Sequence, residues 1–441
     1  MKKPPALLLA LFALTACQTG LTPPSTGAEA PTVPGELVVR FQPGTSEAAK
    51  AELRQRLGAT GVASVMADGE RWKLADAAVD GAIATLQADD RIKLAQRNGL
   101  RRLNVIQSPA VAPPGFSVLQ AATSDPESAK QWHLQRVKFP AAWAKSRGRG
   151  ITVAVIDSGV DPNHPDLKAN LLPMIDEVVA MGEKDILNGT NYNERDGHGH
   201  GTHVCGLVGA LANNAIGVSG AAPEVKILPV KVTNANGDAG DAAITKGITD
   251  AVDKGAQVIN LSIGGPEPSP ILLEALNYAF QKNVAVVIAS GNDSRAVNYP
   301  AAYDGVLSVG AITEENKVAR YSSHGERLVM VAPGGGGPGG TEGRMMFSTT
   351  PTYDCNITLF ERKTKDYGYM AGTSMAAPLV TAAAALLLAL EPGLPPAQIR
   401  TRLAATADDG GDAGFDEFFG YGVLNAQSAV NANTDDGRKL P

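Results

Sequence analysis

The sequence predicts an α/β protein: a three-layer domain with a doubly wound, mainly parallel sheet, preceded by a small α+β domain. Two observations predict the larger domain. Near-continuous apolar runs of strand length recur beyond residue 150, and helical patterns separate them. Strands that are buried on both faces and alternate with helices are typical of a parallel sheet between two helical layers. A different order of elements before residue 104 predicts the smaller domain.

The chain begins with the pattern of an export signal. Two lysines precede an apolar run at 6–16, which is too short to span a bilayer as a stable helix. The run ends in Leu-Thr-Ala-Cys, which resembles a bacterial lipobox. We therefore expect a lipoprotein signal peptide at 1–17, lipidated at Cys17; the alternative is a plain secretory signal with an incidental cysteine. Lipidation would tether the chain to a membrane through acyl chains, without a spanning helix.

Residues 18–35 are rich in Pro, Thr and Gly, which predicts a flexible tether. The segment 36–104 then carries strand, helix, strand, strand, helix and strand patterns. They are ELVVRF, SEAAKAELRQRLG, VASVM, RWKLA, AAVDGAIATLQAD and RIKLAQRN. This β-α-β-β-α-β order is that of the ferredoxin-like split motif.

A second Pro-rich linker is predicted at 105–124, followed by the main domain at 125–433 and a tail at 434–441. The apolar strands of the main domain are ITVAVID, KILPVKV, QVINLSI and VAVVIAS. Helical patterns between them include AAITKGITDAVDKG and PILLEALNYAFQKN. In open parallel sheets the functional groups gather at the carboxyl ends of the strands.

Charge and cysteine content limit the partners. The formal net charge is −6 and no basic run is longer than Arg101-Arg102, so we expect no nucleic-acid partner. Two cysteines lie in the main domain, Cys205 and Cys355. An exported protein can pair such cysteines in a disulfide. However, the small, apolar surroundings of Cys205 favour a buried free thiol.

Three stretches carry candidate chemistry. Asp157 closes the strand ITVAVID, so its carboxylate should lie at the edge of a cleft and needs a partner there. The alternative is an aspartate that only caps the following turn. Ser374 follows Gly-Thr at the start of a long Ala/Leu helix. A serine there is either an N-cap or a hydroxyl beside backbone N–H groups that stabilise an oxyanion.

The third stretch, DGHGHGTHVCG, places His198, His200 and His203 close together. They are either zinc ligands, or one catalytic histidine with two others beside it, or part of a loop rich in histidine by chance. Catalytic zinc helices usually carry histidines at i and i+4 with an intervening glutamate. Here the helical pair is three residues apart without an acid, so we expect no zinc. An aspartate, a histidine and a serine that each lie at the end of a strand or helix can act together: the serine as nucleophile, the histidine as base and the aspartate as the residue that orients the histidine.

The three stretches closely resemble the active-site signatures of the subtilisin-like serine proteases, the subtilases. The signatures are AVIDSGVD, HGTHVCG and GTSMAAP, in the chain order Asp, His, Ser. The resemblance extends over about 125–430 and includes VINLSIGG, ASGN, YPAAYDGVLSVGA, VAPG and GYGVLNAQSAV. It implies a subtilisin-like fold and a serine endopeptidase that works through an acyl-enzyme intermediate.

The resemblance also implies a role for each catalytic residue. Ser374 corresponds to the nucleophile, His200 to the general base and later acid, and Asp157 to the residue that orients the imidazole. Asn292 corresponds to the side-chain donor of the oxyanion hole, with the backbone N–H of Ser374 beside it. We expect His203 to be a buried structural histidine, and His198 either to contact substrate or to remain a bystander.

Substrate binding in this family adds the peptide as a strand between two edge segments. The matching residues are Asp238, Ala239 and Gly240 on one edge, and Ser262, Ile263 and Gly264 on the other. The specificity pocket would be lined by Ser262, Gly264, Ala289, Ser290 and Gly291. These small residues predict a roomy pocket with an apolar preference.

The stretch LANNAIGVSG resembles the calcium loop of the family. The implied ligands are Asn214, the carbonyls of Ala212, Ile216 and Val218, and the carboxylate of Asp166, with Asp125 as a further candidate. All are hard oxygen donors, which calcium prefers. The alternative is a turn without a metal. A structural calcium ion is the only cofactor that we expect.

The segment 36–104 resembles the inhibitory propeptide of the family. The implied partners are therefore the chain's own propeptide, as an intramolecular inhibitor, and protein or peptide substrates. Self-cleavage is expected in the linker 105–124. The chain would be exported as a cell-envelope lipoprotein. After processing the lipid anchor would leave with the propeptide, so the enzyme would be either released to the exterior or held at the envelope only non-covalently.

Two departures from the family pattern are visible. Cys205 replaces the usual alanine of the histidine signature, which predicts sensitivity to thiol reagents. The stretch 334–368 before the nucleophile is longer than usual, and we expect it to form a surface excursion that carries Cys355.

Overall fold

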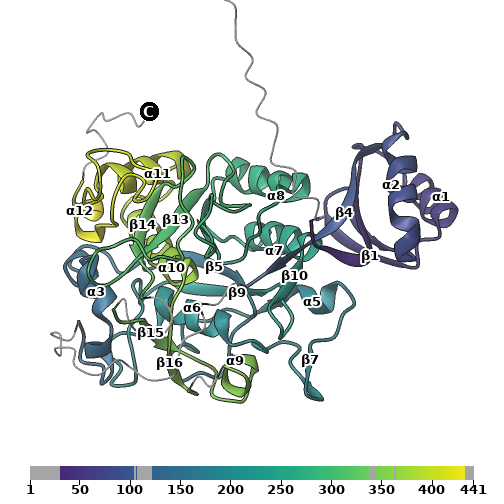
Figure 1. Cartoon of the computed structure of the whole chain (residues 1–441). Coiled ribbons are helices and arrows are strands. Elements are labelled where there is room, and N and C mark those ends of the chain that lie inside the picture. The colour runs from purple at the N-terminus through teal and green to yellow at the C-terminus, as the bar shows by residue number, and fades with distance from the viewer. Residues whose placement is uncertain (1–29, 104–105, 107–121, 337–342, 362–363, 433–441) are drawn as a thin grey trace, which may run out of the picture. The chain divides into compact units, whose positions relative to one another are not determined.

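A computed structural model of the chain (Figure 1) describes residues 30–103, 106, 122–336, 343–361 and 364–432. The predicted signal peptide with Cys17 lies outside these residues, as do the C-terminal tail and most of the predicted tether and linker. The first strand, β1, begins at Thr32. The end of the predicted tether is therefore strand.

The smaller domain has the predicted β-α-β-β-α-β order. Its elements are β1 (Thr32–Phe41), α1 (Glu47–Leu57), β2 (Gly61–Met66), β3 (Gly69–Lys73), η1 (Asp76–Ala78), α2 (Val79–Gln87) and β4 (Ile92–Arg102). Antiparallel pairing gives the order β4-β1-β3-β2. One face of this sheet buries Leu37, Phe41 and Trp72 against the two helices. The ferredoxin-like prediction is confirmed.

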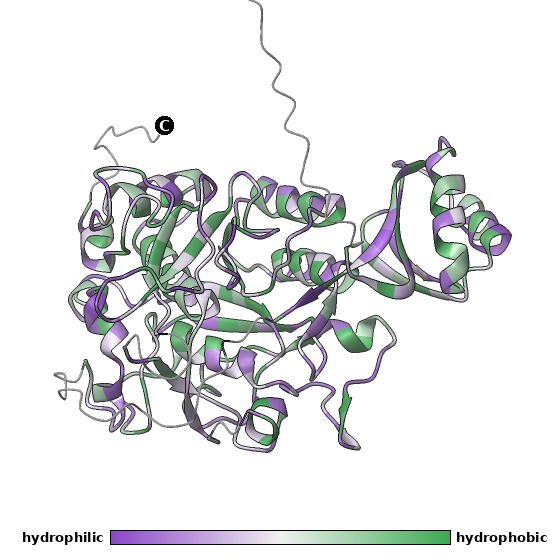
Figure 2. Ribbon diagram, viewed as in Figure 1, coloured by the Kyte–Doolittle hydropathy of each residue, from purple (hydrophilic) through white to green (hydrophobic). Residues whose placement is uncertain are grey.

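The larger domain contains a seven-stranded sheet in which every pair of strands is parallel. Its order is β14 (Met330–Pro333), β13 (Leu307–Ile312), β12 (Ala285–Ala289), β11 (Val258–Leu261), β5 (Thr152–Asp157), β9 (Lys226–Lys231) and β6 (Ile175–Asp176). The central strands are almost wholly buried, and Figure 2 colours much of their ribbon green because most of their residues are hydrophobic. The predicted parallel sheet is confirmed.

Helices cover both faces of this sheet. On one face α10 (Thr373–Leu390) packs across β11 to β14 and against α6 (His200–Gly209); on the other, α7 (Asp241–Asp253) packs against α8 (Pro270–Gln281). Within the described residues, α10 alone is long and apolar enough to span a membrane, and 89% of its apolar window is buried. A helix that is apolar on all sides and buried is a core helix.

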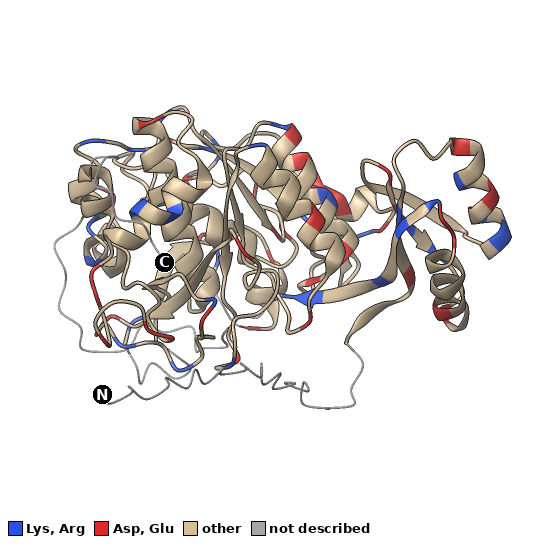
Figure 3. Ribbon diagram, turned by 90° about the horizontal axis from the view of Figure 1, so that it is seen from above, with Lys and Arg blue, Asp and Glu red and all other residues tan. Residues whose placement is uncertain are grey.

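The remaining elements are short and lie around this framework. They are η2 (Ser128–Lys130), α3 (Trp132–Arg136), α4 (Phe139–Ala142), α5 (Glu177–Ala180), β7 (Ile186–Leu187), β8 (Thr190–Asn191), β10 (Asp238–Gly240), β15 (Met346–Thr349), α9 (Asn356–Leu359), β16 (Tyr367–Met370), α11 (Pro396–Ala405) and α12 (Ala426–Asn431). Basic and acidic residues are interspersed over the ribbon in the view of Figure 3.

The long stretch before Ser374 is not the surface excursion that we expected. Its hairpin, β15 and β16, lies against α6: the Ser348 hydroxyl donates to the carbonyl of His203 (3.0 Å) and the Thr349 hydroxyl to that of Thr202 (2.7 Å). The backbone N–H of Ile357 donates to the carbonyl of His198 (3.1 Å), and Cys355 is fully buried. The stretch therefore supports the helix that begins at His200.

Candidate active site

The three predicted catalytic residues lie at the ends of elements on the carboxyl side of the sheet. Asp157 is the last residue of β5, His200 is the first residue of α6, and Ser374 is in the first turn of α10. All three are buried. Parallel strands place their carboxyl ends at one edge, which is why residues far apart in sequence meet there.

Asp157 and His200 form a buried, hydrogen-bonded pair. The Nδ1 atom of His200 lies 2.8 Å from Oδ1 and 3.0 Å from Oδ2 of Asp157. The Nδ1–H therefore donates to the carboxylate, and Nε2 is left as the basic nitrogen. Among the described residues Nε2 has no hydrogen-bond partner. The imidazole is thus oriented to accept a proton from a group in the cleft.

The charge of Asp157 changes the basicity of His200. Burial alone would lower the pKa of the imidazole, but attraction to Asp157 and the hydrogen bond to it, with smaller contributions from Asp196 and Glu361, raise the pKa above its ordinary value. A histidine with a raised pKa is a stronger base, which suits proton abstraction from a hydroxyl.

The start of α6 is held by Asp196, which sequence analysis did not single out. Its carboxylate accepts from the N–H groups of Gly199 (2.6 Å) and Thr202 (2.8 Å) and from the hydroxyl of Ser158 (2.8 Å). Burial raises the pKa of this carboxyl group. An acid just before a helix satisfies free N–H groups and the helix dipole, a signal that was present in the sequence.

Close backbone contact also fixes the position of His200. A Cβ atom on Gly201 would lie 2.1 Å from the carbonyl oxygen of Gly159, so no side chain fits there. The N–H of Gly201 donates to the hydroxyl of Ser158, the residue after Asp157 (2.9 Å). The segment that carries Asp157 and the segment that carries His200 are therefore joined by a direct hydrogen bond.

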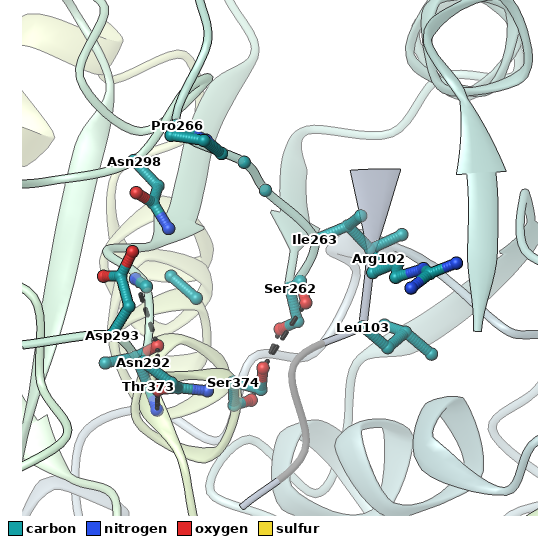
Figure 4. A pocket seen from close by; sticks show the side chains of 14 residues that line it. Arg102, Leu103, Ser262, Ile263, Pro266, Asn292, Asp293, Asn298, Thr373 and Ser374 are labelled. Atoms are coloured by element: carbon teal, nitrogen blue, oxygen red, sulfur yellow. Dashed lines mark hydrogen bonds between the residues drawn. The ribbon is translucent and has the colours of Figure 1, made fainter. Parts of the chain in front are cut away.

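The hydroxyl of Ser374 donates to the carbonyl of Ser262 at 3.3 Å (Figure 4). It thus has a weak bond to the cleft wall in place of a bond to His200. Hydrogen bonds between nucleophile and base are often long before substrate binds and tighten afterwards.

Asn292 and the start of α10 form a pair of hydrogen-bond donors. The amide oxygen of Asn292 accepts from the N–H (2.9 Å) and the hydroxyl (2.8 Å) of Thr373. Because its oxygen is held there, the amide NH2 group points the other way, and both Asn292 and Ser374 line the same pocket (Figure 4). N–H donors at the start of a helix stabilise an anion. Thr373 is a positioning residue that sequence analysis missed.

The pocket beside Ser374 has a volume of about 290 Å³. Predicted residues that line it are Ser262, Ile263, Gly264, Ala289 and Gly291. Ser290 does not: its side chain is buried and donates to the carbonyl of Ser323 (2.9 Å). Asp293, Asn298 and Thr373 also line the pocket. The predicted apolar preference therefore lacks support, since a wall with a carboxylate and an amide accepts polar side chains.

A segment of the chain itself lies between the two predicted edges. The end of β4 pairs antiparallel with β10: Leu100 with Gly240, Arg101 with Ala239, and Arg102 with Asp238. On its other side Arg102 forms an antiparallel bridge with Gly264. Four of the six predicted edge residues, Asp238, Ala239, Gly240 and Gly264, therefore pair with this strand. The other two, Ser262 and Ile263, directly precede Gly264 in the chain. We expected the strand to end near Asn98; it runs on into the cleft.

This segment reaches the pocket. The N–H of Leu103 donates to the carbonyl of Gly237 (2.9 Å), and Arg102 and Leu103 line the pocket together with Ser374. His198 lies beside the same segment, because a Cβ on Gly237 would be 3.2 Å from both Leu103 and the His198 ring. His198 is thus next to the cleft. His203 is fully buried and bonds the carbonyl of Gly368 (3.2 Å).

The three histidines have different neighbours. His200 bonds Asp157 and His203 bonds Gly368, while the rings of His198 and His200 lie 6.2 Å apart at centroid distance. Within the described residues, no group of three or more His, Cys, Asp or Glu side chains is arranged to hold a metal. Both main-domain cysteines are free and buried.

The predicted calcium loop surrounds Asp166. Oδ1 of Asp166 accepts from the amide NH2 group of Asn214 (2.8 Å), and Oδ2 accepts from the N–H of Val218 (2.9 Å). Burial raises the pKa of Asp166 to about 6. Among hydrogen bonds between described backbone groups, none ends on the carbonyls of Ala212, Ile216 or Val218. Free carbonyl oxygens around a desolvated carboxylate fit a calcium ion.

Asp125, which we considered as a further calcium ligand, has its carboxylate engaged in hydrogen bonds within the loop. Its two oxygens already accept from the N–H groups of Asn213, Asn214 and Ala215 and from the hydroxyls of Thr123 and Ser219. Five donors fill its lone pairs. It holds the loop together and does not offer an oxygen to a metal.

Known proteins resemble this chain in sequence and in fold. A model of the subtilase family matches residues 148–422, and a model of the fervidolysin N-terminal prodomain matches 23–98. Subtilisin DY of Bacillus licheniformis is 37% identical over 64% of this chain and 92% of its own length. The thermophilic serine proteinase of Bacillus sp. strain AK1 is 32% identical over 90% of this chain and 88% of its own.

A solved structure covers both domains. Fervidolysin from Fervidobacterium pennivorans, described as a keratinolytic enzyme related to subtilisin, aligns with a TM-score of 0.75 and 27% identity over 93% of this chain. The present chain spans 62% of the length of that structure.

Proposed function

The chain belongs to the subtilase family of serine endopeptidases, and we propose that it hydrolyses peptide bonds through Ser374, His200 and Asp157 after cleaving off its own N-terminal domain. The prodomain match supports a zymogen that processes itself. The observation that carries the proposal is the antiparallel strand at 100–102, which lies in the cleft as a substrate would.

The proposed reaction follows from the contacts of the three residues. Ser374 Oγ attacks the scissile carbonyl while His200 Nε2 accepts its proton, and Asp157 stabilises the imidazolium that forms. The oxyanion receives hydrogen bonds from Asn292 and from the N–H of Ser374. His200 then protonates the leaving amine. Water, activated by the same imidazole, hydrolyses the acyl-enzyme and restores Ser374.

The register of the strand indicates the bond that is processed. Leu103 donates its N–H to Gly237 and lines the pocket beside Ser374, so we assign it to the second position before the cleaved bond. We propose cleavage after Asn104, at the edge of the predicted linker 105–124, which leaves Val105 as the new N-terminus. The boundaries 36–104 and 125–433 for propeptide and peptidase remain part of this proposal.

The same strand explains inhibition after cleavage. The end of β4 would stay in place as a product strand, held by main-chain bonds on both sides and by the smaller domain. The buried Arg71 supports this contact, because its guanidinium bonds Glu36 (2.9 Å) and also the carbonyl of Met181 in the larger domain. The propeptide must leave before substrates enter.

We further propose export through the signal at 1–17, with lipidation at Cys17 that anchors the zymogen to the cell envelope. Cleavage after Asn104 would release an extracellular enzyme from that anchor. A structural calcium ion would be held by Asp166, Asn214 and the carbonyls of Ala212, Ile216 and Val218, where it would neutralise a desolvated carboxylate.

A serine-directed probe tests the catalytic proposal. The processed enzyme is incubated with a fluorophosphonate, digested and mapped, and casein hydrolysis is followed in parallel with a Ser374→Ala variant. We expect one label, on Ser374, with loss of casein hydrolysis in step with labelling. A wild type that hydrolyses casein without labelling at Ser374, or an equally active variant, would sink the proposal.

A further inference from the structure

We propose that Asp241 forms a buried arginine-binding subsite in the cleft, so that the enzyme prefers substrates with arginine at the fourth position before the cleaved bond. This inference rests on the proposed function, because it takes the chain's own strand as a substrate analogue. With Leu103 in the second position (P2), Arg102 is in the third (P3) and Arg101 in the fourth (P4). Sequence analysis did not single out Asp241.

The guanidinium of Arg101 is bound on three sides. Its Nε donates to Oδ1 of Asp241 (2.7 Å) and its Nη2 to Oδ2 (3.2 Å), while Nη1 donates to the carbonyl of Glu267 (2.7 Å). Side-chain exposure is 4% for Arg101 and 2% for Asp241. A two-point contact between arginine and carboxylate in a buried site is strong and specific in geometry.

The surroundings are shaped for this side chain. Asp241 is the first residue of α7, where the helix dipole favours a carboxylate. A Cβ on Gly265 would lie 3.0 Å from Nη1 of Arg101, and a Cβ on Gly99 would lie 2.4 Å from Oδ2 of Asp241. The glycine at 265 lets the guanidinium pass along the cleft wall, and Gly99 lets β4 approach the carboxylate.

The neighbouring arginine provides an internal comparison. Arg102 also pairs with an aspartate, Asp238, at 2.5 Å, but its side chain is 69% exposed. Exposed ion pairs contribute little because water screens them. The two adjacent arginines therefore differ in burial, and the selectivity should come from the fourth position and not from the third.

Selectivity follows from the cost of an unpaired charge. A substrate without arginine in this position would bury the carboxylate of Asp241 with no cation, which is strongly unfavourable. Lysine would restore the charge but not the two-point geometry or the third bond to Glu267. The site therefore disfavours neutral side chains, disfavours acidic ones even more because like charges repel, and accepts lysine in part.

Three internally quenched peptides that cover residues 99–108 test the proposal with the self-processed enzyme. The first has the native sequence Gly-Leu-Arg-Arg-Leu-Asn-Val-Ile-Gln-Ser. The second carries alanine for Arg101 and the third alanine for Arg102. We expect kcat/KM to fall about 10²–10³-fold for the second peptide and less than about fivefold for the third.

An Asp241→Asn enzyme is measured with the same peptides. Its preference for arginine over alanine at the fourth position should drop below about tenfold, which a merely structural role for Asp241 would not cause. The peptide comparison on wild type stands even if this variant fails to fold.

The outcomes separate this inference from the proposed function. Wild type that cleaves the first two peptides within threefold of each other, while a fluorophosphonate labels Ser374, overturns the arginine subsite and leaves the proposed function intact. Wild type that cleaves none of the peptides and takes no label overturns both.

Discussion

In the proposed mechanism, Asp157 sets the pH range in which His200 can act as the base. Because the base must be neutral to accept a proton, kcat/KM falls as pH drops through the pKa of His200. That pKa is raised, so we expect the acid limb above the usual histidine value of about 6.5. Asp157→Asn should move the limb to lower pH, since the main contribution that opposes the effect of burial is then lost, and lower kcat by roughly 10⁴-fold. A pH profile of kcat/KM checks both effects.

A matched control uses Glu361, which contributes least to this shift. Glu361→Gln should move the acid limb down by less than Asp157→Asn does. Identical acid limbs in wild type and Asp157→Asn would contradict the role given to the carboxylate.

Thr373 positions the amide of Asn292. Thr373→Val removes the hydroxyl bond of 2.8 Å to the amide oxygen but keeps the N–H bond of 2.9 Å. We expect kcat to fall about tenfold with little change in KM, less than the 10²–10³-fold cost of removing the donor itself. Thr373→Ser, which keeps the hydroxyl, should retain most of the activity. A loss confined to KM would argue against an effect on the oxyanion.

The thiols of the main domain should be unreactive. Burial raises the pKa of Cys205 well above its ordinary value and that of Cys355 to about 12, so neither is a thiolate at neutral pH. This revises the expected sensitivity to thiol reagents. Ellman's reagent should titrate no cysteine in the processed enzyme and two in denaturant. Stoichiometric modification of the native enzyme, with loss of activity that Cys205→Ala prevents, would contradict it.

Among single residues, the sequence pointed to the candidate site residues that lie within or next to recognisable sequence signatures. Asp157, His200 and Ser374 lie at ends of elements, and Asn292 lines the same pocket as Ser374. Asp241 and Thr373 were missed because their roles depend on partners distant in sequence. Arg101 is 140 residues from Asp241, and no local pattern announces such a pair.

The calcium loop can be tested at the scale of one element. We expect saturating calcium to raise the Tm by roughly 5 °C, because a ligand bound only to the folded state stabilises it. The pKa of Asp166 is about 6, and a protonated carboxyl binds no metal, so the effect should shrink as pH falls below 6. Thermal melts with and without calcium measure it.

Two variants distinguish the carboxylates of this loop. Asp166→Asn should abolish the calcium-dependent rise in Tm. Asp125→Asn should lower the Tm in both conditions and keep the rise, because Asp125 accepts from loop N–H groups. A rise of equal size in Asp166→Asn would remove that residue from the ligand set.

Element order was easier to predict than element ends and contacts. Apolar periodicity predicted β5, β9, β11 and β12 and the helices between them, because buried parallel strands leave a clear signal. The last residues of β4 and the hairpin of β15 and β16 are paired with segments far along the chain. Their strand conformation depends on those partners, which local composition does not reveal.

For the whole molecule, the main feature is that one strand belongs to both domains. β4 pairs with β1 inside the smaller domain and, at its end, with β10 in the larger one. The smaller domain thereby places residues 100–103 along β10 and Gly237, in the register that we propose for a substrate. In the proposed function, inhibition and processing both depend on this strand.

The most direct test of this account is the intact mass of the purified protein beside that of a Ser374→Ala variant. We predict that the wild type yields a mature chain that begins at Val105, together with the released propeptide, and that the variant remains uncut after Asn104. A mature start well inside 107–124, or a variant processed at the same bond as the wild type, would contradict self-cleavage in the observed register.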